Sequence, residues 1–536
     1  MLTRRNLGLA AAAAPLLPNT PALAATAQPG WDQGQLAHLL PSVSHDRMLI
    51  KASFTRPLPT PPTLLVGETR VTGLRGDSAG LFWQFHVAGL RPGTPYRLQL
   101  RDGNGRSLAE PWPLKTFPAP GQAASKLRVL MYSCAGGHDL FAEAHTGFRF
   151  LPAAVRRRLL QRALSFQPDA LVANGDHIYW DLLAPKGGPM LGGSAAAIAY
   201  AGRFDRAAPL LGGPNEQVLL RSAGPQIVPL YGALCRSVPV FFLQDDHDHY
   251  DNDEATDAAV TFPPDTFMVQ AARATQRLYY PEFLPDPNRP LGLPGGAVVD
   301  QAGWRPPGLS ESFGTLRYGT LAELMLYDVR RTMTLNGPTG VFVAPEVEAW
   351  LKARMAARDT AHVVNAPSNP PGWSAGKWGE WYPDILGADG KLTVDVPKPY
   401  WQRGWLAQHD RLMQAMSGMA ERVPLVITGD LHAIAEGRML SAGELDFSRR
   451  PVIAALPGPL GTSDGGWASQ FRGVGPAVPN HIRLEETVKP LEENGFCLMD
   501  FTPESLTIRY YKWNQKTQPV EEIDQLQPFH TSEFKR

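Results

Sequence analysis

Short segments in which apolar and polar residues alternate fill the chain from about residue 41 to residue 118. RMLIKASF, LFWQFHVAGL and YRLQLRD are the clearest of them. Successive side chains of a strand point to opposite faces of a sheet, so this period of two is typical of strands with one buried face. Because turn-forming residues separate the segments, we expect a small β-sandwich domain over residues 41–118.

A tyrosine beside a turn indicates the type of sandwich. The stretch GLRPGTPYRLQL at residues 89–100 resembles the tyrosine corner of fibronectin III-like domains, in which the tyrosine hydroxyl bonds back to the nearby backbone. Tyr96 stands in that position. Residues 116–125 are rich in Pro, Gly and Ala, which is typical of a linker.

The pattern changes after this linker, and we expect an α/β domain over residues 126–536. Continuous apolar runs, typical of buried strands, occur at 127–134, 169–176, 238–246, 321–331 and 423–430. Apolar residues at helical spacing occur at 150–166 and near 401–420, and a hairpin is expected beyond residue 500. Pro/Gly-rich segments without periodicity, which we interpret as insertions over the sheet ends, are 182–230, 255–310 and 360–400.

Side chains that can bind metal follow four of these apolar runs. The runs end at Cys134, at Asp176, at Asp245-Asp246-His247, and at Asp430 with His432. In open α/β sheets the carboxyl ends of the strands converge on one crevice, so these separate segments are expected to meet. Two acids and a histidine beside an apolar strand are costly to bury without a partner. Asp430 and His432, two residues apart in an extended segment, can face one metal pair.

Each of these residues also has an ordinary explanation. A turn aspartate bonded to its own backbone accounts for Asp176, and a buried structural thiol is the commonest role of a residue such as Cys134. A satisfied core histidine accounts for His432, and a solvated loop accounts for the acidic residues at 251–254. The four strand ends together favour a metal centre, and a thiolate ligand suits Fe(III) or Zn better than Ca or Mg.

The run LYDVRR places Asp328 and Arg330 at another strand end. An arginine near two metal ions can hold a phosphate group by two parallel hydrogen bonds. A surface ion pair between Arg330 and Asp328 is the alternative, and both interpretations stay open.

The N-terminus has the features of an export signal. Arg4 and Arg5 precede an alanine-rich run, and a small-residue cleavage site follows at residues 22–24. We therefore expect a twin-arginine signal peptide over residues 1–24, the twin-arginine translocase as a partner during export, and a bacterial periplasmic or secreted protein. We see no apolar run of about 20 residues that could span a bilayer, so we expect no stable membrane insertion.

Charge and cysteine content narrow the function further. Lys plus Arg and Asp plus Glu both number 51, so the net charge is zero. A nucleic-acid binder would carry a basic excess, and we expect no nucleic-acid binding. The three cysteines, Cys134, Cys235 and Cys497, are an odd number, so at least one is unpaired or binds something.

The motifs SC, GDHIYWD, DDHD, YDVRR and GDLH, in this order, resemble those of the alkaline phosphatase D (PhoD-like) family of the calcineurin-like metallophosphoesterase superfamily. The resemblance extends over most of the chain from about residue 40, in spaced motifs. It implies an exported protein with an N-terminal β-sandwich and an α/β domain built as a four-layer αββα sandwich around two metal ions.

The resemblance also implies roles for the site residues. The metal ligands would be Cys134, Tyr179 and Asp430 for Fe(III), Asp176 as the bridge to Ca(II), Asp246 and His432 for the second metal, and Asp181 in the calcium shell. His247 would face the phosphate as a general acid or charge stabiliser, and Arg330 would hold phosphate oxygens. Other divalent metals are alternatives to these two ions.

We therefore expect an exported phosphoric ester hydrolase in which a metal-activated hydroxide attacks phosphorus. Small-molecule and polymer esters, and monoesters and diesters, all stay open as substrates. A calcium-dependent extracellular binding protein without hydrolase activity is the alternative, although it gives no role to Cys134. An iron-dependent oxidoreductase is a third interpretation, but the sequence shows no recognisable organic-cofactor site.

Overall fold

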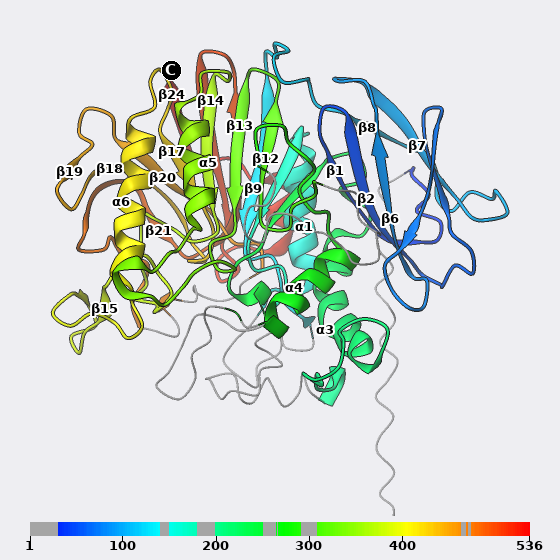
Figure 1. Cartoon of the computed structure of the whole chain (residues 1–536), viewed down its shortest axis with the longest axis horizontal. Helices are drawn as coiled ribbons and strands as arrows, with labels where there is room; N and C mark the ends of the chain where they lie inside the picture. The colour runs from blue at the N-terminus through cyan, green and yellow to red at the C-terminus, as the bar shows by residue number, and fades with distance from the viewer. Residues whose placement is uncertain are drawn as a thin grey trace, which may run out of the picture.

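The N-terminal part of the chain forms two four-stranded antiparallel sheets in the computed structural model (Figure 1). The structure describes residues 30–139, 150–179, 199–249, 264, 266–290, 308–461, 468–469 and 473–536. The first sheet has the order β1 (Leu36–Val43), β2 (Arg47–Phe54), β6 (Phe82–Ala88), β5 (Leu74–Arg75). The second has the order β4 (Thr69–Thr72), β3 (Thr63–Val66), β7 (Pro95–Arg101), β8 (Trp112–Lys115).

The two sheets bury their apolar residues against each other. Ile50 and Phe85 of the first sheet and Leu98 and Leu100 of the second belong to one buried hydrophobic cluster. The hydrogen bond predicted for Tyr96 is confirmed, because the backbone N–H of Arg91 donates to its hydroxyl at 2.7 Å. This bond fixes the turn that leads into β7.

Two larger sheets make up the rest of the fold. The six-stranded sheet has the order β11 (Val240–Leu243), β10 (Ala170–Asn174), β9 (Leu127–Ser133), β22 (Asn494–Phe501), β23 (Ser505–Trp513), β24 (His530–Lys535). The other has the order β12 (Phe313–Tyr318), β13 (Ala322–Tyr327), β14 (His362–Pro367), β17 (Leu425–Ile427), β20 (Val452–Pro457), β18 (Ile434–Ala442), β19 (Leu445–Asp446), with β21 (Ile482–Leu491) paired to β18. β9, β10 and β11 are parallel, as are β13, β14, β17 and β20.

Alternation along the buried strands divides the core into layers. Val129 and Met131 of β9 share one hydrophobic cluster with Leu425 and Ile427 of β17, between the two sheets. The intervening Leu130 belongs to the other cluster, which also contains residues of the helices. The longer helices of the described residues are α1 (Ala153–Ser165), α3 (Pro214–Tyr231), α4 (Thr266–Leu278), α5 (Pro345–Ala356) and α6 (Arg403–Ser417). α1 contacts α3 and α5 contacts α6 (Figure 1), which gives the predicted αββα order of layers.

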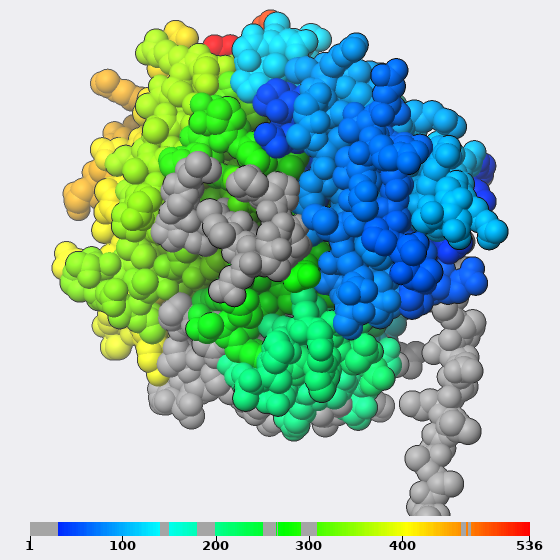
Figure 2. All heavy atoms as spheres, turned by 45° about the vertical axis from the view of Figure 1, so that its right-hand side comes forward, coloured from blue at the N-terminus to red at the C-terminus, as the bar shows by residue number. Residues whose placement is uncertain are grey.

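The N-terminal sandwich packs against the larger part of the chain (Figure 2). Lys51 of β2 and Glu282 form a buried ion pair at 3.0 Å across this contact. The ring of His38 in β1 lies 2.8 Å from the carbonyl oxygen of Tyr279. Within the described residues, no helix has both the length and the apolar character needed to cross a membrane.

Regular elements lie in segments that the sequence pattern indicated were irregular. α3 overlaps 182–230 and ends one residue beyond it, α4 lies within 255–310, and β14 lies within 360–400, so the interpretation of these segments as insertions is wrong there. β14 is even a central strand, between β13 and β17. The short β15 (Ile385–Leu386) and β16 (Leu392–Thr393) pair with each other in the same segment.

Candidate metal centre

The predicted site residues lie at the carboxyl ends of neighbouring strands. Cys134 follows β9, Asp176 follows β10, and Asp430 follows β17 in the facing sheet. The predicted site residues within the described part of the chain each have no more than 4% of their surface exposed; they are Cys134, Asp176, Tyr179, Asp246, His247, Arg330, Asp430 and His432. Asp181 and the acidic residues at 251–254 lie outside the described residues.

The backbone is strained at four of these positions. Cys134, Asp176, Asp430 and His432 have φ values of 48°, 55°, 73° and 51°. Left-handed conformations are uncommon for residues other than glycine and cost on the order of 1–3 kcal/mol each. Such strain persists where the surrounding structure enforces it, and it clusters at functional sites. Among the described residues, these are four of the seven non-glycine positions with positive φ, so the strain is concentrated at these strand ends.

Glycines allow the strand ends to approach each other closely. Gly175, with φ of 77°, precedes Asp176, and a Cβ atom there would lie 2.7 Å from the Cβ of Asp245. A Cβ on Gly429, which precedes Asp430, would lie 2.4 Å from the Cβ of Ser133 in the facing sheet. Any larger residue would push the strand ends apart.

Cys134, Asp176 and His432 form the first group of potential ligands. One ligand atom from each lies within 4.8 Å of the others. Both carboxylate oxygens of Asp176 are buried and accept no hydrogen bond in the structure. The hydroxyl of Tyr179 lies 3.3 Å from Nε2 of His432, which places a phenol beside the same group. A buried carboxylate without donors is unfavourable unless a cation accompanies it, so these residues fit a metal ion.

The pKa values of Cys134, Asp176 and His432 also fit a metal site. Burial raises the pKa of the Cys134 thiol well above its usual value, and the negative charge of Asp176 adds to this effect. Burial also raises the pKa of Asp176, although His247 opposes it. Burial lowers the pKa of His432 to about 3, so its imidazole is neutral, as a metal ligand must be. A bound cation would reverse the two upward shifts by stabilising the thiolate and the carboxylate.

His247 connects this group to the next strand end. It opens the short 3₁₀ helix η3 (His247–His249) after β11. Ligand atoms of His247, Asp176 and Asp246 also lie within 4.8 Å of one another. Its ring lies 4.3 Å, centroid to centroid, from the ring of Tyr179. The imidazole is therefore held against the first group of ligands.

Asp245, Asp246 and Asp430 form a second group, and basic side chains neutralise it. Their carboxylate oxygens lie within 4.8 Å of one another. Nζ of Lys377 donates to Oδ2 of Asp246 at 3.0 Å and to Oδ1 of Asp430 at 2.7 Å. Burial by itself would raise the pKa of Asp246, but Lys377, His247 and Arg330 together hold it well below the usual value.

Arg330 supports the same carboxylates from the other side. Its Nε donates to Oδ1 of Asp245 at 2.7 Å, and its Nη2 donates to Oδ2 of Asp430 at 3.3 Å. Nη1 donates to the carbonyl oxygen of Gly379 at 2.7 Å. Asp328 instead pairs with the ring of His249 at 2.9 Å. The alternative of a surface ion pair between Arg330 and Asp328 is therefore wrong.

The structure groups two of the predicted ligands differently from the resemblance. His432, rather than Asp430, lies with Cys134 and Asp176. Asp430 lies with Asp246, on the side that Lys377 and Arg330 neutralise. Asp430 and His432 both follow β17, where the chain leaves the extended conformation. Because both residues have positive φ values, their side chains do not point to the same side as they would in an extended segment.

Three residues that support the site were not predicted from the sequence. Lys377 bridges two carboxylates as described, and Nδ2 of Asn369 donates to Oδ2 of Asp430 at 3.2 Å. Asp248 accepts hydrogen bonds from the backbone N–H groups of His177 and Ile178, both at 2.9 Å, and so joins η3 to the end of β10. Lys377 and Asn369 belong to the segment without periodicity, which gave no signal for either.

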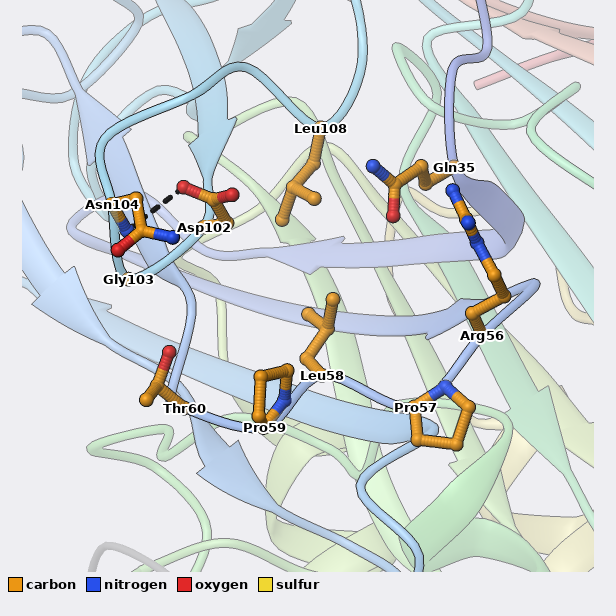
Figure 3. A pocket seen from close by; sticks show the side chains of 10 residues that line it. All are labelled: Gln35, Arg56, Pro57, Leu58, Pro59, Thr60, Asp102, Gly103, Asn104 and Leu108. Carbon is orange, nitrogen blue, oxygen red and sulfur yellow. Dashed lines mark hydrogen bonds between the residues drawn. The ribbon is translucent and has the colours of Figure 1, made fainter.

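A separate pocket lies in the N-terminal sandwich (Figure 3). Its lining comes from two loops and from the residue that precedes β1; examples are Gln35, Arg56, Leu58, Asp102 and Leu108. None of the predicted site residues lines it, and it contains no group of metal ligands. Among the described residues, the candidate metal ligands therefore lie at the strand ends and not in this pocket.

Comparisons with known proteins find the fold among solved structures. No family model and no curated protein matches this chain. The solved structure of PhoD aligns with a TM-score of 0.58 and 14% identity, over 93% of this chain and 90% of that chain. The purple acid phosphatase PPD1 from yellow lupin (Lupinus luteus) seeds aligns with a TM-score of 0.54 and 11% identity, over 94% of this chain and 75% of that chain. The predicted likeness to PhoD is therefore confirmed at the level of the fold.

Proposed function

We propose that this chain is an exported, metal-dependent phosphoric ester hydrolase of the PhoD-like type. The observation that carries the proposal is the buried carboxylate of Asp176, which has no hydrogen-bond donor and lies between Cys134 and His432. The fold shared with PhoD and with a purple acid phosphatase supports the same reaction class. The substrate is a small-molecule or polymer phosphate ester, either a monoester or a diester.

Cys134, Asp176, His432 and Tyr179 would hold the first ion, which we propose is Fe(III). Thiolate, carboxylate, imidazole and phenolate are ligands that suit this ion. Asp246 and Asp430 would serve a second cation, for which Ca(II) is the candidate with oxygen ligands. When bound, the metal ions supply the Lewis acidity that polarises a phosphoryl group and activates water.

His247 has the position of a general acid in this proposal. Its imidazole lies beside Asp176 and Asp246, and its ring packs on Tyr179. A proton delivered to the departing ester oxygen is worth about 10²–10⁴ in rate. Arg330 keeps Asp245 and Asp430 in position, and its positive charge stabilises the charge that develops on the phosphoryl oxygens.

A pair of variants tests these roles. Asp176→Asn should lose most of the bound metal and reduce hydrolysis to background, because the amide brings no negative charge to the ions. His247→Ala should keep its metal but lower kcat by about 10²-fold or more. Metal content by elemental analysis and hydrolysis of para-nitrophenyl phosphate are measured on the same samples, with the exposed Asp395→Asn as the control. Wild-type metal content and activity in Asp176→Asn would contradict the proposal.

Export through the twin-arginine route is the proposal for localisation. Arg4, Arg5 and the cleavage site at residues 22–24 support it. Replacing both arginines by lysine keeps the charge but removes the guanidinium pair, and should leave the protein in the cytoplasm. Cell fractionation with an antibody to the chain measures this. Full periplasmic recovery of the double lysine variant would overturn the proposed route.

A further inference from the structure

The ammonium group of Lys377 lies between two carboxylates that would otherwise bind a second metal ion. Nζ lies 3.0 Å from Oδ2 of Asp246 and 2.7 Å from Oδ1 of Asp430, and all three side chains are buried. We propose that Lys377 occupies the second cation position, so that one metal ion binds tightly and another binds only by displacing the lysine. This inference rests on the proposed function and refines its metal content.

A comparison of two carboxylates carries the argument. Asp176 accepts no hydrogen bond on either buried oxygen, and Nε2 of His432 lies 3.7 Å from its Oδ2, beyond hydrogen-bond distance. Both carboxylate oxygens of Asp430 accept hydrogen bonds. Lys377 donates to Oδ1, while Asn369 and Arg330 donate to Oδ2 at 3.2 Å and 3.3 Å. The chain therefore leaves one carboxylate open to a metal ion and neutralises the other with its own side chains.

The surrounding loop fixes Lys377 in this position. Nζ of Lys398 donates to the carbonyl oxygen of Lys377 and lies 3.6 Å from Oε2 of Glu380. Glu380 in turn accepts from Oγ of Ser374 at 2.6 Å and from the backbone N–H of Ala375 at 2.9 Å. Lys398 and Glu380 are both buried. Lys377 is thus part of a braced loop, unlike a surface lysine that is free to change rotamer.

The consequence is a competition between two cations. A divalent ion bound to both Asp246 and Asp430 would lie close to the ammonium group, and like charges at short range in a buried site repel strongly. Lys377 must therefore leave before the ion can bind. The affinity of oxygen-ligand sites for Ca²⁺ depends on the net charge of their ligands, so losing this lysine should raise it.

Counting metal ions in lysine variants tests the inference. Lys377→Met removes the charge and keeps the length of the side chain, and Lys377→Arg keeps the charge. The exposed Lys352→Met on α5 is the control for the change in net charge. Each protein is stripped of metal, reloaded with iron, and titrated with Ca²⁺ by calorimetry, and the bound iron and calcium are counted by elemental analysis.

We expect wild type, Lys377→Arg and Lys352→Met to bind one iron per chain and calcium only weakly. Lys377→Met should bind one further calcium ion, at least about tenfold more tightly than wild type. Its metal-free form should also melt at a lower temperature than wild type, because Asp246 and Asp430 lose the positive charge of Lys377, and Ca²⁺ should restore that temperature.

Two results would overturn the inference: tight binding of both ions by wild type, or no gain of calcium affinity in Lys377→Met. If Lys377→Met does not fold even with calcium present, Lys377→Gln is titrated with Ca²⁺ instead. A gain of calcium affinity over wild type then supports the inference, and no gain overturns it. Phosphate ester hydrolysis is measured separately on the wild type. Its absence would refute the proposed function, while the calcium titration would still decide what Lys377 does.

Discussion

Three buried cysteines show how position decides the role of a residue. Burial raises the pKa of all three thiols, to about 12 in the case of Cys235. Only Cys134 has a carboxylate and a histidine within reach of its sulfur among the described residues. It also has a positive φ value, which the other two lack. From the sequence, a structural thiol was an equally ordinary explanation, and only the alignment of four strand ends favoured the ligand.

Tyr179 offers a spectroscopic test at the residue scale. A phenolate bound to ferric iron should give the protein a purple or brown absorption band, which Tyr179→Phe should abolish while most of the iron stays bound by the remaining ligands. Visible absorption spectra and iron content of the purified proteins measure this. Tyr132→Phe is the matched control, because the Tyr132 hydroxyl is buried but lies 2.8 Å from that of Tyr231, outside the site. An unchanged band in Tyr179→Phe would show that its oxygen is not a ligand.

The elements that build the site were predictable to the extent that their sequences were regular. The strands β9, β10, β11 and β17 are apolar runs that end in polar residues, and parallel strands bring such ends together. α3 was missed because it contains Pro225 and Pro229, which normally interrupt a helix. β14 was missed because its six residues, HVVNAP, combine a short apolar run with a polar residue and a proline.

Missing β14 explains why Lys377 and Asn369 were also missed. Both residues follow this strand, at the same edge of the sheet as the other strand ends. A lysine in a loop without periodicity is ordinarily a solvated residue, and no pattern in the sequence distinguishes one that points into a site. The candidate metal ligands could therefore be predicted from the sequence, but Lys377 and Asn369, which donate hydrogen bonds to them, could not.

The hairpin of β22 and β23 gives a prediction at the scale of the element. Asp500 of β22 joins two strands, because Arg128 of β9 donates to both its oxygens, at 2.6 Å and 3.0 Å, and Arg509 of β23 donates to one of them. Burial alone would raise the pKa of Asp500, but these two arginines lower it from its usual 3.8. Because the pKa of Asp500 is lower in the folded protein than its usual 3.8, its ion pairs with the two arginines stabilise the fold above pH 3.8. This stabilisation is lost as the pH falls through the pKa that Asp500 has in the folded protein.

Asp500→Asn should therefore lower the melting temperature at pH 7 by about 1–3 °C, since the pair is only half-buried. As the pH falls below 3.8, the difference from wild type should shrink, because protonation removes the same charge. Calorimetry across this pH range measures it. The exposed Asp395→Asn serves as the control, and a difference that grows toward low pH would contradict the assignment.

At the scale of the whole molecule, the fold places an unusual site on a common framework. Two facing sheets bring Cys134 and Asp176 from one sheet against Asp430 and His432 from the other. The α/β fold alone hosts many functions, so the functional argument rests on the residues at the crevice. A buried ion pair between Lys51 and Glu282 joins the N-terminal sandwich to this framework. Neither residue of the pair belongs to the strand ends that carry the candidate ligands.

The most direct test of the central claim is a chelation experiment on the purified wild-type protein. Hydrolysis of para-nitrophenyl phosphate and of bis-para-nitrophenyl phosphate is measured before chelation, after it, and after iron and calcium are returned separately. We predict phosphate ester hydrolysis that disappears with the metal and returns with iron, because the buried Asp176 carboxylate, which accepts no hydrogen bond, lies in the group of ligands proposed to hold iron. Hydrolysis that is unaffected by complete removal of metal, or no hydrolysis of either ester by the metal-loaded protein, would contradict the account.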